Sequence, residues 1–466
     1  MAQDRPSPPA RQEMSEGETI AAAATPPGSG ALGVLRLSGP RAATIARSLI
    51  RGAAALDPRR AAMERVFDDE GPIDQAVVVY FPGPHSATGE DVVEFSVHGS
   101  SYIMARLLKA LLAKGAAAAQ PGEFTQRAFL NGRLDLAQAE AVCELIRAGT
   151  GSAHRAALAQ LEGGLSKEVS LARAPILEML VGVEALLDHP EEDIPGFSSG
   201  ELSSRLEELG RPLVALADSH ARGRLLSEGP RVCLVGRPNA GKSSLLNALL
   251  GAERAIVCPE PGTTRDTLEE PCDVRGLPAV LIDTAGLREQ APAAAERSGM
   301  ERAERALRGS DLALLVIDAS REEDEEDRRV HGRILETARR EGRAVISVYN
   351  KMDLRAAPAA APEGSAWVSA LRRTGLDDLL SRISAKLAPE ERGGTVVTSA
   401  RHQDCLRRAL ACLDEAAQAV RLHGSLVEDR LASHLRQALA ALDEIGGAAA
   451  QDEVLAAIFS KFCVGK

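Results

Sequence analysis

The sequence predicts a protein of several domains, an α/β domain followed by an all-α domain into which a second α/β domain is inserted. Three observations predict this architecture. The chain has 466 residues, and at roughly 150 residues per domain this length indicates about three domains. Short β-type runs fill the N-terminal quarter, whereas Ala, Leu, Glu and Arg dominate two later stretches. Between those stretches strand and helix patterns alternate, which is typical of a parallel sheet with crossover helices.

The elements follow from the local patterns. The polar, Pro-containing residues 1–17 predict a disordered leader. In the N-terminal α/β domain, 18–133, we expect strands at 33–37, 75–80 and 92–97 and a helix at 102–113. Apolar residues at helical spacing predict the two halves of the helical domain, 134–228 and 389–466. In the inserted domain, 229–388, we expect strands at 231–235, 279–282, 312–317 and 344–349.

Composition excludes several classes. With 55 Lys and Arg against 66 Asp and Glu, the net charge is −11, which argues against a surface coated in basic residues for wrapping nucleic acid. No apolar run reaches the roughly 18 residues of a membrane span, and the N-terminus does not resemble a signal peptide. The seven cysteines include no C-x-x-C pair, so we expect no disulfide framework or zinc ribbon and a cytoplasmic location. We expect the acidic run 321–327 to be a solvated loop.

Residues 236–243 read G-x-x-x-x-G-K-S, directly after a predicted strand and at the start of a predicted helix. In such a phosphate-binding loop, glycines let the backbone amides approach the phosphate oxygens. Lys242 would reach the β- and γ-phosphates, and the Ser243 hydroxyl would ligate Mg²⁺. The sequence therefore predicts a nucleotide-binding site at this loop.

Three later segments complete the predicted nucleotide site: Asp-Thr-Ala-Gly at 283–286, Asn-Lys-Met-Asp at 350–353 and Ser-Ala at 369–370. Asp283 begins Asp-Thr-Ala-Gly after a strand, where it can hold the Mg²⁺ shell. In the Asn-Lys-Met-Asp segment, the Asp353 carboxylate offers two acceptors to guanine N1 and N2 and repels adenine. The order of these motifs predicts GTP rather than ATP, with these binding residues: Asn239, Ala240, Gly241, Lys242, Ser243, Ser244, Thr263, Thr264, Asp283, Thr284, Ala285, Gly286, Asn350, Lys351, Asp353, Ser369, Ala370 and Leu371.

Hydrolysis of GTP by this chain would need a catalytic group other than the usual water-orienting Gln. Leu287 follows Asp-Thr-Ala-Gly, at the position where Ras-type proteins carry a Gln that orients water. Asn239 could instead ligate a monovalent cation that replaces the charge of an arginine finger. Either Glu289 or Glu296 could position the attacking water, and Thr264 could be the second Mg²⁺ ligand.

Five segments outside the nucleotide motifs carry a resemblance. They are 18–28, 81–91, 121–132, 134–140 and the terminal Phe-Cys-Val-Gly-Lys at 462–466. Together with 236–243 and 262–266, they make the chain resemble the tRNA modification GTPase MnmE (TrmE) family from residue 18 to the end.

The resemblance implies a folate-binding, dimerising N-terminal α/β domain, a split helical domain and an inserted Ras-like P-loop G domain. It implies a homodimer whose GTP hydrolysis is stimulated by K⁺ when two G domains meet. It also implies an FAD-dependent partner of the MnmG type, in a heterotetramer or larger assembly. The pair would convert C5 of the wobble uridine of certain tRNAs to an aminomethyl-type group, such as carboxymethylaminomethyl. A tetrahydrofolate derivative, 5-formyl or 5,10-methylene, would supply the one-carbon unit, and tRNA would be bound mainly with the partner.

Site residues follow from the same resemblance. Mg²⁺ would be bound by Ser243 and Thr264, and K⁺ by Asn239, Cys258, Glu260 and Thr263. The predicted catalytic residues are Glu296, Lys242 and Cys463. The predicted folate contacts are Arg36, Glu94, Arg133 and Lys466.

Two other classes of GTPase are alternatives. A ribosome-assembly GTPase of the Era or Der kind would share the nucleotide motifs but would need an RNA-binding module such as a KH domain with its G-x-x-G loop. A dynamin-like GTPase would need a lipid-binding stretch, such as a basic amphipathic helix. Neither appendage is evident in the sequence.

Overall fold

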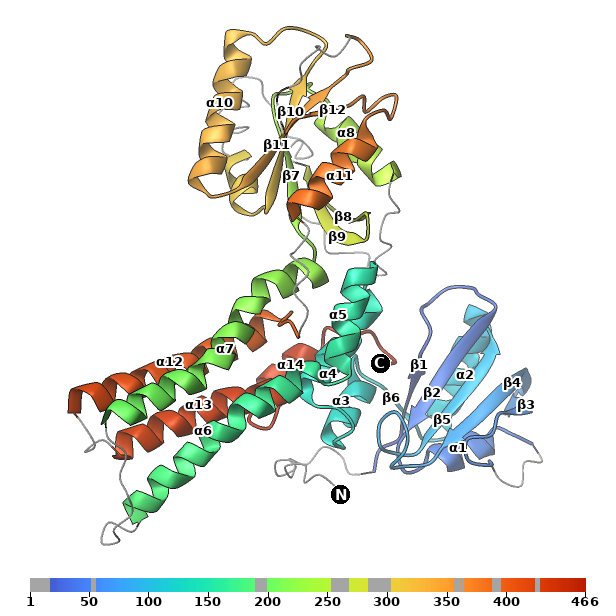
Figure 1. The fold of residues 1–466 in the computed structure, drawn as a ribbon. Helices are drawn as coiled ribbons and strands as arrows, with labels where there is room; N and C mark the ends of the chain where they lie inside the picture. The colour runs from blue at the N-terminus through green and yellow to red at the C-terminus, as the bar shows by residue number, and fades with distance from the viewer. Residues whose placement is uncertain are drawn as a thin grey trace. The chain divides into compact units, whose positions relative to one another are not determined.

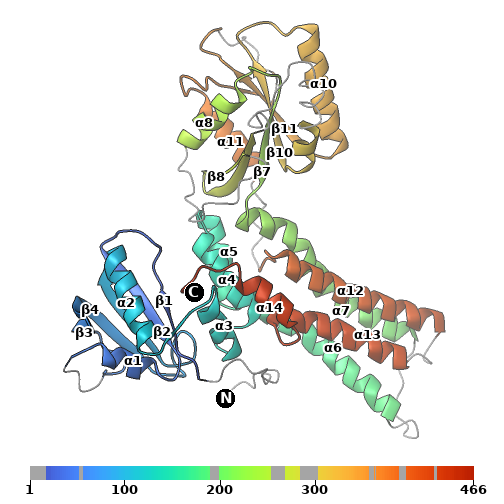
Figure 2. The same ribbon diagram turned by 180° about the vertical axis from the view of Figure 1, so that it is seen from behind.

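The computed structural model describes residues 17–51, 56–188, 199–252, 268–283, 303–355, 362, 364–387, 395–423 and 428–466. By its contacts the chain divides into two compact units. The first comprises Met1–Cys143, Gln160–Leu213 and Cys405–Lys466, and the second comprises Glu144–Ala159 and Val214–Asp404. Figures 1 and 2 show the same chain from opposite sides.

The first unit begins with a six-stranded sheet in the order β3-β4-β5-β2-β1-β6. Its pairings are antiparallel except for β6, which runs parallel to β1. The predicted strands at 33–37, 75–80 and 92–97 and the helix at 102–113 are all confirmed. The elements are β1 (Ile20–Ala23), β2 (Leu32–Ser38), α1 (Ala42–Ser48), β3 (Ala62–Asp68), β4 (Gly71–Phe81), β5 (Val92–His98), α2 (Ser101–Ala113) and β6 (Ala117–Ala118).

Side-chain alternation gives this sheet two different faces. Leu35 and Phe95 are fully buried in a core that α1 and α2 cover. Because successive strand residues point to opposite faces, the residues between the core positions lie on the other face. Arg36 on β2 and Glu94 on β5 are such residues, and they are direct cross-strand neighbours. The sheet thus brings two charged side chains, 58 positions apart in the sequence, into contact.

Helices complete the first unit. Arg173 on α6 donates two hydrogen bonds, of 2.7 and 3.1 Å, to Asp443 on α13. Arg421 on α12 contacts Ser203 and Glu207 on α7. Helices that precede and follow the second sheet in sequence therefore pack against each other. The helices of this unit are α3 (Glu123–Leu130), α6 (Gly164–Asp188), α13 (Glu428–Gly446) and α14 (Asp452–Phe459), together with parts of α4 (Leu136–Arg147), α7 (Ser199–Ser227) and α12 (Ala400–His423), whereas α5 (Gly151–Leu161) lies mainly in the second unit.

An ion pair between β3 and α2 makes the stability of the first unit depend on pH. Asp68 accepts hydrogen bonds of 2.7 Å from both Nε and Nη2 of Arg106. These bonds are the main reason why the pKa of Asp68 is lowered from 3.8 to about 2, although desolvation opposes the shift. Since the folded-state pKa lies below the unfolded value, the stabilisation is complete above about pH 4 and is lost as the pH falls towards about 2.

We therefore expect Arg106→Gln to lower the melting temperature by a few degrees at about pH 7. The difference from the unmodified protein should shrink at about pH 3, because there the Asp68 carboxylate is partly protonated in the unfolded chain. Circular dichroism melts of both proteins at the two pH values check this. A difference that stays constant with pH would contradict the role of the ion pair.

The second unit contains a six-stranded sheet in the order β12-β11-β10-β7-β9-β8. All its pairings are parallel except that of β8 with β9. The strands predicted at 231–235, 279–282, 312–317 and 344–349 are confirmed. The elements are β7 (Arg231–Val235), α8 (Lys242–Ala252), β8 (Leu268–Val274), β9 (Leu277–Asp283), β10 (Leu312–Asp318), α10 (Glu325–Arg340), β11 (Ala344–Asn350), β12 (Ala366–Trp367) and α11 (Leu376–Leu387).

Both faces of this sheet are covered. Leu245 on α8 and Leu379 on α11 pack into the core on one face, and Ile334 on α10 packs into the core on the other. The continuous apolar run of β10 follows from this, since a strand buried on both faces has no polar side to show. Ligands of such doubly wound sheets bind beyond the carboxyl ends of the strands. Among the described residues, no helix is long and apolar enough to cross a membrane.

The expectation that the acidic run 321–327 is a solvated loop is right for residues 321–324, which lie outside any helix and are mostly exposed, and wrong for the rest of the run. Its last residues begin α10, with Asp324 as the N-cap. The Asp324 carboxylate accepts from the Asp327 amide, and the Asp327 carboxylate accepts from the Asp324 amide, which forms a capping box. Asp327 is only 5% exposed. Carboxylates are favoured there because the first turn of a helix presents unpaired amides.

Candidate nucleotide and folate sites

The loop between β7 and α8 has the backbone that a phosphate-binding loop requires. Gly236 and Gly241 have φ values of +146° and +92°. A Cβ on Gly236 would lie 2.3 Å from the carbonyl oxygen of Val316, and one on Gly241 would lie 2.2 Å from Nδ2 of Asn350. Asn239 also has a positive φ, of +65°. The loop therefore needs glycine at both positions, for space as well as for conformation.

Three polar side chains meet at the carboxyl ends of β7 and β9. Lys242 donates to the carbonyl oxygens of Gly236 and Arg237 at 3.0 and 2.9 Å. Burial lowers the pKa of Lys242, and the nearby Asp283 carboxylate opposes that effect. Ser243 donates a 2.8 Å hydrogen bond to Asp283. A hydroxyl and a carboxylate so placed are the hard oxygen ligands that Mg²⁺ prefers.

Asn350, at the end of β11, connects two loops. Its Nδ2 donates to the carbonyl oxygen of Ala240 at 3.0 Å, and its Oδ1 accepts from the amide of Ala370 at 3.1 Å. The residue is 2% exposed, so both halves of its amide need a partner. Asn350 thus holds the phosphate-binding loop against the 369–371 segment.

Lys351 braces the same loop from the base-binding side. Its ammonium donates to the carbonyl oxygen of Asn239 at 2.8 Å and to Asp318 at 2.6 Å. Burial would raise the pKa of Asp318, but hydrogen bonds from Lys351 and Ser320 hold it below its ordinary value. Asp318 was not among the predicted site residues. Its position at the end of β10, next to the strand that carries the loop, is the signal that could have identified it.

The base-recognition residues also lie together. Asp353 accepts a hydrogen bond from the Ser369 hydroxyl, which in turn accepts from the Arg372 amide at 3.1 Å. This arrangement orients the carboxylate whose two oxygens can accept from guanine N1 and N2. Leu371 is 81% exposed, and Ser244 is exposed in the first turn of α8.

Several of the residues predicted to bind the nucleotide or the ions, or to position water, lie outside the described part of the chain. They are Cys258, Glu260, Thr263, Thr264, Thr284, Ala285, Gly286, Glu289 and Glu296.

In the first unit, the structure brings together part of the second predicted site. Arg36 and Glu94 form an ion pair of 2.8 Å, with side chains 20% and 27% exposed. The Arg36 guanidinium also lies 5.7 Å from the centroid of the Phe124 ring, at the start of α3. An aromatic ring beside paired donors and acceptors is the type of surface that binds a planar heterocycle.

The C-terminal tail reaches the same region. Val464 forms an antiparallel bridge with Pro121, and the carbonyl oxygen of Lys466 accepts from the amide of Phe124 at 3.2 Å. Cys463 is exposed on this tail. Arg133 is placed beside the 86–91 loop, where its Cγ would lie 3.3 Å from a Cβ on Gly89. Residues 464–466 therefore lie against the N-terminal part of the chain, whereas Phe462 packs into the core formed with α4 and α14.

Sequence reasoning also missed Arg237, the second residue of the phosphate-binding loop. Its guanidinium contacts the carboxylates of Asp324, Glu326 and Asp327 at the start of α10. A variable position of the motif carries no signal by itself. The sequence signal that could have indicated a role for Arg237 is the acidic run 321–327, because its carboxylates need basic partners.

A doubly wound sheet with a G-x-x-x-x-G-K-S loop, a facing Ser243–Asp283 pair and an Asn-Lys-Met-Asp base pocket defines a P-loop GTP-binding protein. Comparison with known families extends this class to the whole chain. Residues 136–463 match the model described as "MnmE helical domain", and residues 19–133 match "GTP-binding protein TrmE N-terminus".

Individual relatives support the same family as the family models. The chain is 46% identical to the tRNA modification GTPase MnmE of Chloroflexus aurantiacus, a match that covers 96% of this chain and 100% of the relative. It is 40% identical to the tRNA modification GTPase MnmE of Aquifex aeolicus, with the same shares covered. The chain belongs to the family of tRNA modification GTPases MnmE. Full-length agreement of this kind decides against the Era or Der alternative.

Among solved structures, one of the matches is a variant of Aquifex aeolicus Era bound to GDP and AlF₄⁻. It is 27% identical and covers 41% of this chain and 67% of that chain, with a TM-score of 0.28.

Proposed function

We propose that this protein is a K⁺-stimulated GTPase that acts with an FAD-dependent partner of the MnmG type in the cytoplasm. Together they modify C5 of the wobble uridine of certain tRNAs to an aminomethyl-type group, such as carboxymethylaminomethyl. The observation that carries the proposal is the match to MnmE relatives over 96% of the chain. The geometry of the nucleotide site supports the GTPase part independently.

We infer that residues 229–388, which make up most of the second unit, are a G domain inserted into a split helical domain. The pairing of α6 with α13 and of α7 with α12 supports this, because each pair joins a helix before the second sheet to one after it. We infer that the N-terminal sheet is of the folate-binding type. The predicted domain limits, 18–133, 134–228, 229–388 and 389–466, belong to the same proposal.

Mg²⁺ would be held by Ser243 and Thr264, with Asp283 in its outer shell. The residues present fit this ion: the Ser243 hydroxyl lies 2.8 Å from the Asp283 carboxylate, and small oxygen ligands suit Mg²⁺. The bound ion would neutralise charge on the β- and γ-phosphates. Lys242, at the first turn of α8, would bind the same phosphates.

K⁺ would be bound by Asn239, with Thr263 and the backbone carbonyls of Cys258 and Glu260. Asn239 supports this assignment from the described part of the site, because it is exposed at the outer edge of the phosphate-binding loop. The ion would supply the positive charge that an arginine finger supplies elsewhere. Glu296 would orient the attacking water, with Glu289 as the alternative.

The folate derivative would bind against Arg36, Glu94, Arg133 and Lys466. Charged donors and acceptors around the Phe124 ring fit a folate, whose pterin is planar and polar and whose glutamate is anionic. Such a derivative supplies a one-carbon unit when bound. Cys463, exposed on the tail, is proposed as a thiol close to this site.

The assembly proposed is a homodimer through the N-terminal domain, joined by the flavoprotein in a heterotetramer or larger complex. The net charge of −11 supports a division of labour in which tRNA is bound mainly with the partner.

The test is GTP hydrolysis by the purified full-length protein in KCl and in NaCl of equal ionic strength. We expect the rate in K⁺ to exceed that in Na⁺ by roughly tenfold or more, because only a cation of the right size can complete a site built by Asn239 and its neighbours. Equal rates in the two salts would rule out the proposed cation mechanism.

A further inference from the structure

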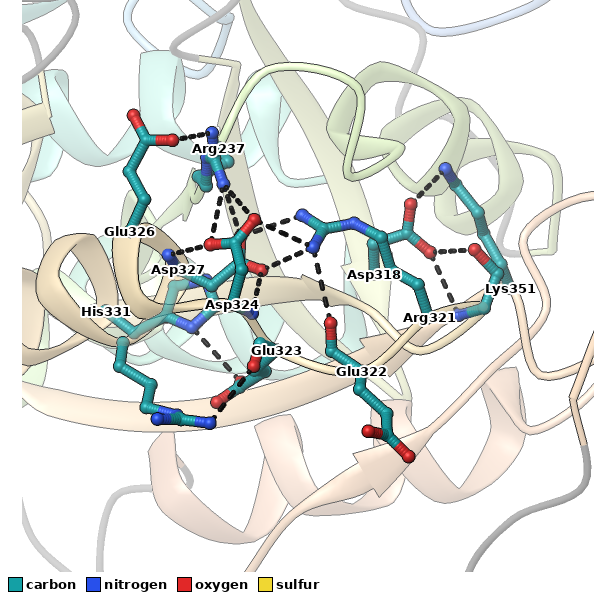
Figure 3. A network of polar contacts seen from close by, with 12 residues as sticks. Arg237, Asp318, Arg321, Glu322, Glu323, Asp324, Glu326, Asp327, His331 and Lys351 are labelled. Atoms are coloured by element: carbon teal, nitrogen blue, oxygen red, sulfur yellow. Dashed lines mark hydrogen bonds and ion pairs between the residues drawn. The ribbon is translucent and has the colours of Figure 1, made fainter.

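A cluster of charges joins the phosphate-binding loop to the start of α10 (Figure 3). Arg237 Nη1 lies 2.8 Å from Asp327 Oδ1 and 3.3 Å from Asp324, and its Nη2 lies 2.7 Å from Glu326. Arg321 approaches the same aspartates, at 2.7 Å from Asp327 and 3.1 Å from Asp324. Asp327 therefore sits between two guanidinium groups.

The anchor of this cluster is rigid. Asp324 and Asp327 already hold each other's amides in the capping box of α10. The helix itself is packed on the sheet through Ile334 and Ala338, which are 2% and 0% exposed. Burial would raise the pKa of Asp327, but its bonds to Arg321 and Arg237 hold it well below its usual range. The carboxylate is thus charged at neutral pH and fixed in place.

The loop on the other side of the cluster is also held by Asn350, which donates to the Ala240 carbonyl, and by Lys242, which donates to the Gly236 and Arg237 carbonyls. A polar cavity of about 210 Å³ lies between the loop and α10, with Asn239 and His331 among its walls. Beside this cavity, the Arg237 ion pairs join the loop directly to α10. From the opposite side, Lys351 holds the Asn239 carbonyl at 2.8 Å.

Asn239 has a backbone φ of +65°, in the left-handed region that Asn adopts more readily than most other non-glycine residues. Arg237 stands two residues before Asn239, and its own carbonyl accepts from Lys242 at 2.9 Å. The segment 237–239 is thus held at its first residue by α10 and at its last by Lys351.

We propose that Arg237 is a positioning residue for the cation site: its ion pairs with the start of α10 hold Asn239 where that side chain can bind K⁺. The inference rests on the proposed K⁺-stimulated hydrolysis. It predicts that removing the Arg237 contacts weakens the use of K⁺ far more than it weakens nucleotide binding, since the glycines and Lys242 that hold the phosphates remain.

The test compares Arg237→Gln with the unmodified full-length protein. GTP hydrolysis is measured over a KCl series with choline chloride keeping the ionic strength constant, and GDP affinity is measured with a fluorescent GDP. We expect the half-saturating K⁺ concentration to rise roughly tenfold, as is typical when a residue that orients a metal ligand is lost. GDP affinity should change by less than about twofold to threefold, a small effect on the scale of lost loop contacts.

Two further variants sharpen the result. Arg237→Lys keeps the charge but not the planar fork, so it should recover only part of the K⁺ affinity. Glu326→Gln removes one exposed partner from the α10 side without touching the loop, and it should shift K⁺ dependence in the same direction by a smaller factor. Glu326→Gln also decides the question if Arg237→Gln does not fold.

The matched control is Arg333→Gln, which removes an exposed ion pair of the same helix with Glu304 and should leave K⁺ dependence unchanged. If the unmodified protein is stimulated by K⁺ but Arg237→Gln and Glu326→Gln show its half-saturating concentration, the role of Arg237 is wrong and the proposed function stands. If K⁺ does not stimulate the unmodified protein, both are wrong.

Discussion

Gly241→Ala is expected to weaken GTP and GDP binding roughly 100-fold or more. The new Cβ would lie 2.2 Å from Nδ2 of Asn350, well inside any allowed contact. Asn350 cannot retreat, because it is buried between the Ala240 carbonyl and the Ala370 amide. The substitution therefore forces apart the phosphate-binding loop and the 369–371 segment, which are proposed to bind opposite ends of the nucleotide.

The size of the effect follows from two costs. A non-glycine residue at a φ of +92° is strained by about 1–3 kcal/mol. Losing the buried hydrogen bonds of Asn350 costs about 1–3 kcal/mol more. The two costs sum to about 2–6 kcal/mol. Each 1.4 kcal/mol is about a factor of ten in affinity, so a sum of about 2.8 kcal/mol already accounts for two orders of magnitude.

Titration with a fluorescent GDP, alongside a thermal melt, checks this prediction. Gly332→Ala is the matched control: Gly332 lies in α10, and a Cβ there would meet nothing within 4 Å. That change should leave nucleotide affinity intact and raise stability by up to about 1 kcal/mol. A folded Gly241→Ala protein that binds GDP as the unmodified protein does would show that the loop accommodates a side chain.

Gly465→Ala is expected to abolish docking of the C-terminal tail and to weaken folate binding at least tenfold, while GTP hydrolysis by the isolated protein stays near its original rate. Gly465 has a φ of +94°, and a Cβ there would lie 2.0 Å from the carbonyl oxygen of Ala23. That oxygen belongs to β1, the backbone of a sheet, and cannot move aside. The tail must therefore lift off.

Loss of tail docking would displace both predicted functional residues of the tail, Cys463 and Lys466. Lys466 is held by its carbonyl to the amide of Phe124, and Cys463 precedes it by three positions. When the tail lifts, Lys466 leaves Phe124, the residue whose ring lies beside Arg36. A lost charged contact and its orientation together are worth about 1.5–3 kcal/mol, which corresponds to at least tenfold in affinity.

Calorimetric titration of the full-length protein with 5-formyltetrahydrofolate measures this effect. Gly446→Ala serves as the control, because Gly446 lies at the end of α13 with open space around its Cα. Equal folate affinity in Gly465→Ala and the unmodified protein would mean that the tail does not contribute to the folate site. A parallel loss of GTP hydrolysis would instead point to general misfolding.

The strands and the nucleotide motifs could be predicted from the sequence because their signals are local. Apolar runs such as that of β10 reflect burial on both faces, and the spacing within 236–243 reflects the backbone's own contact with phosphate. Arg237 could not be predicted to pair with Asp327, because these residues are 90 positions apart. The burial of Asp327 at the end of the acidic run could not be predicted for the same reason, since only packing brings Arg237 to it.

The sequence by itself determined the class of this protein: the GTP motifs, the ends of the chain and the order of its segments are enough to place it, because each depends on a short stretch of residue types. The tertiary structure alone decided which of those residues act together. Register placed Arg36 beside Glu94, tail docking placed Lys466 against Phe124, and helix packing placed α10 beneath Arg237. These contacts join residues distant in sequence, and only the close packing of sheets and helices selects them.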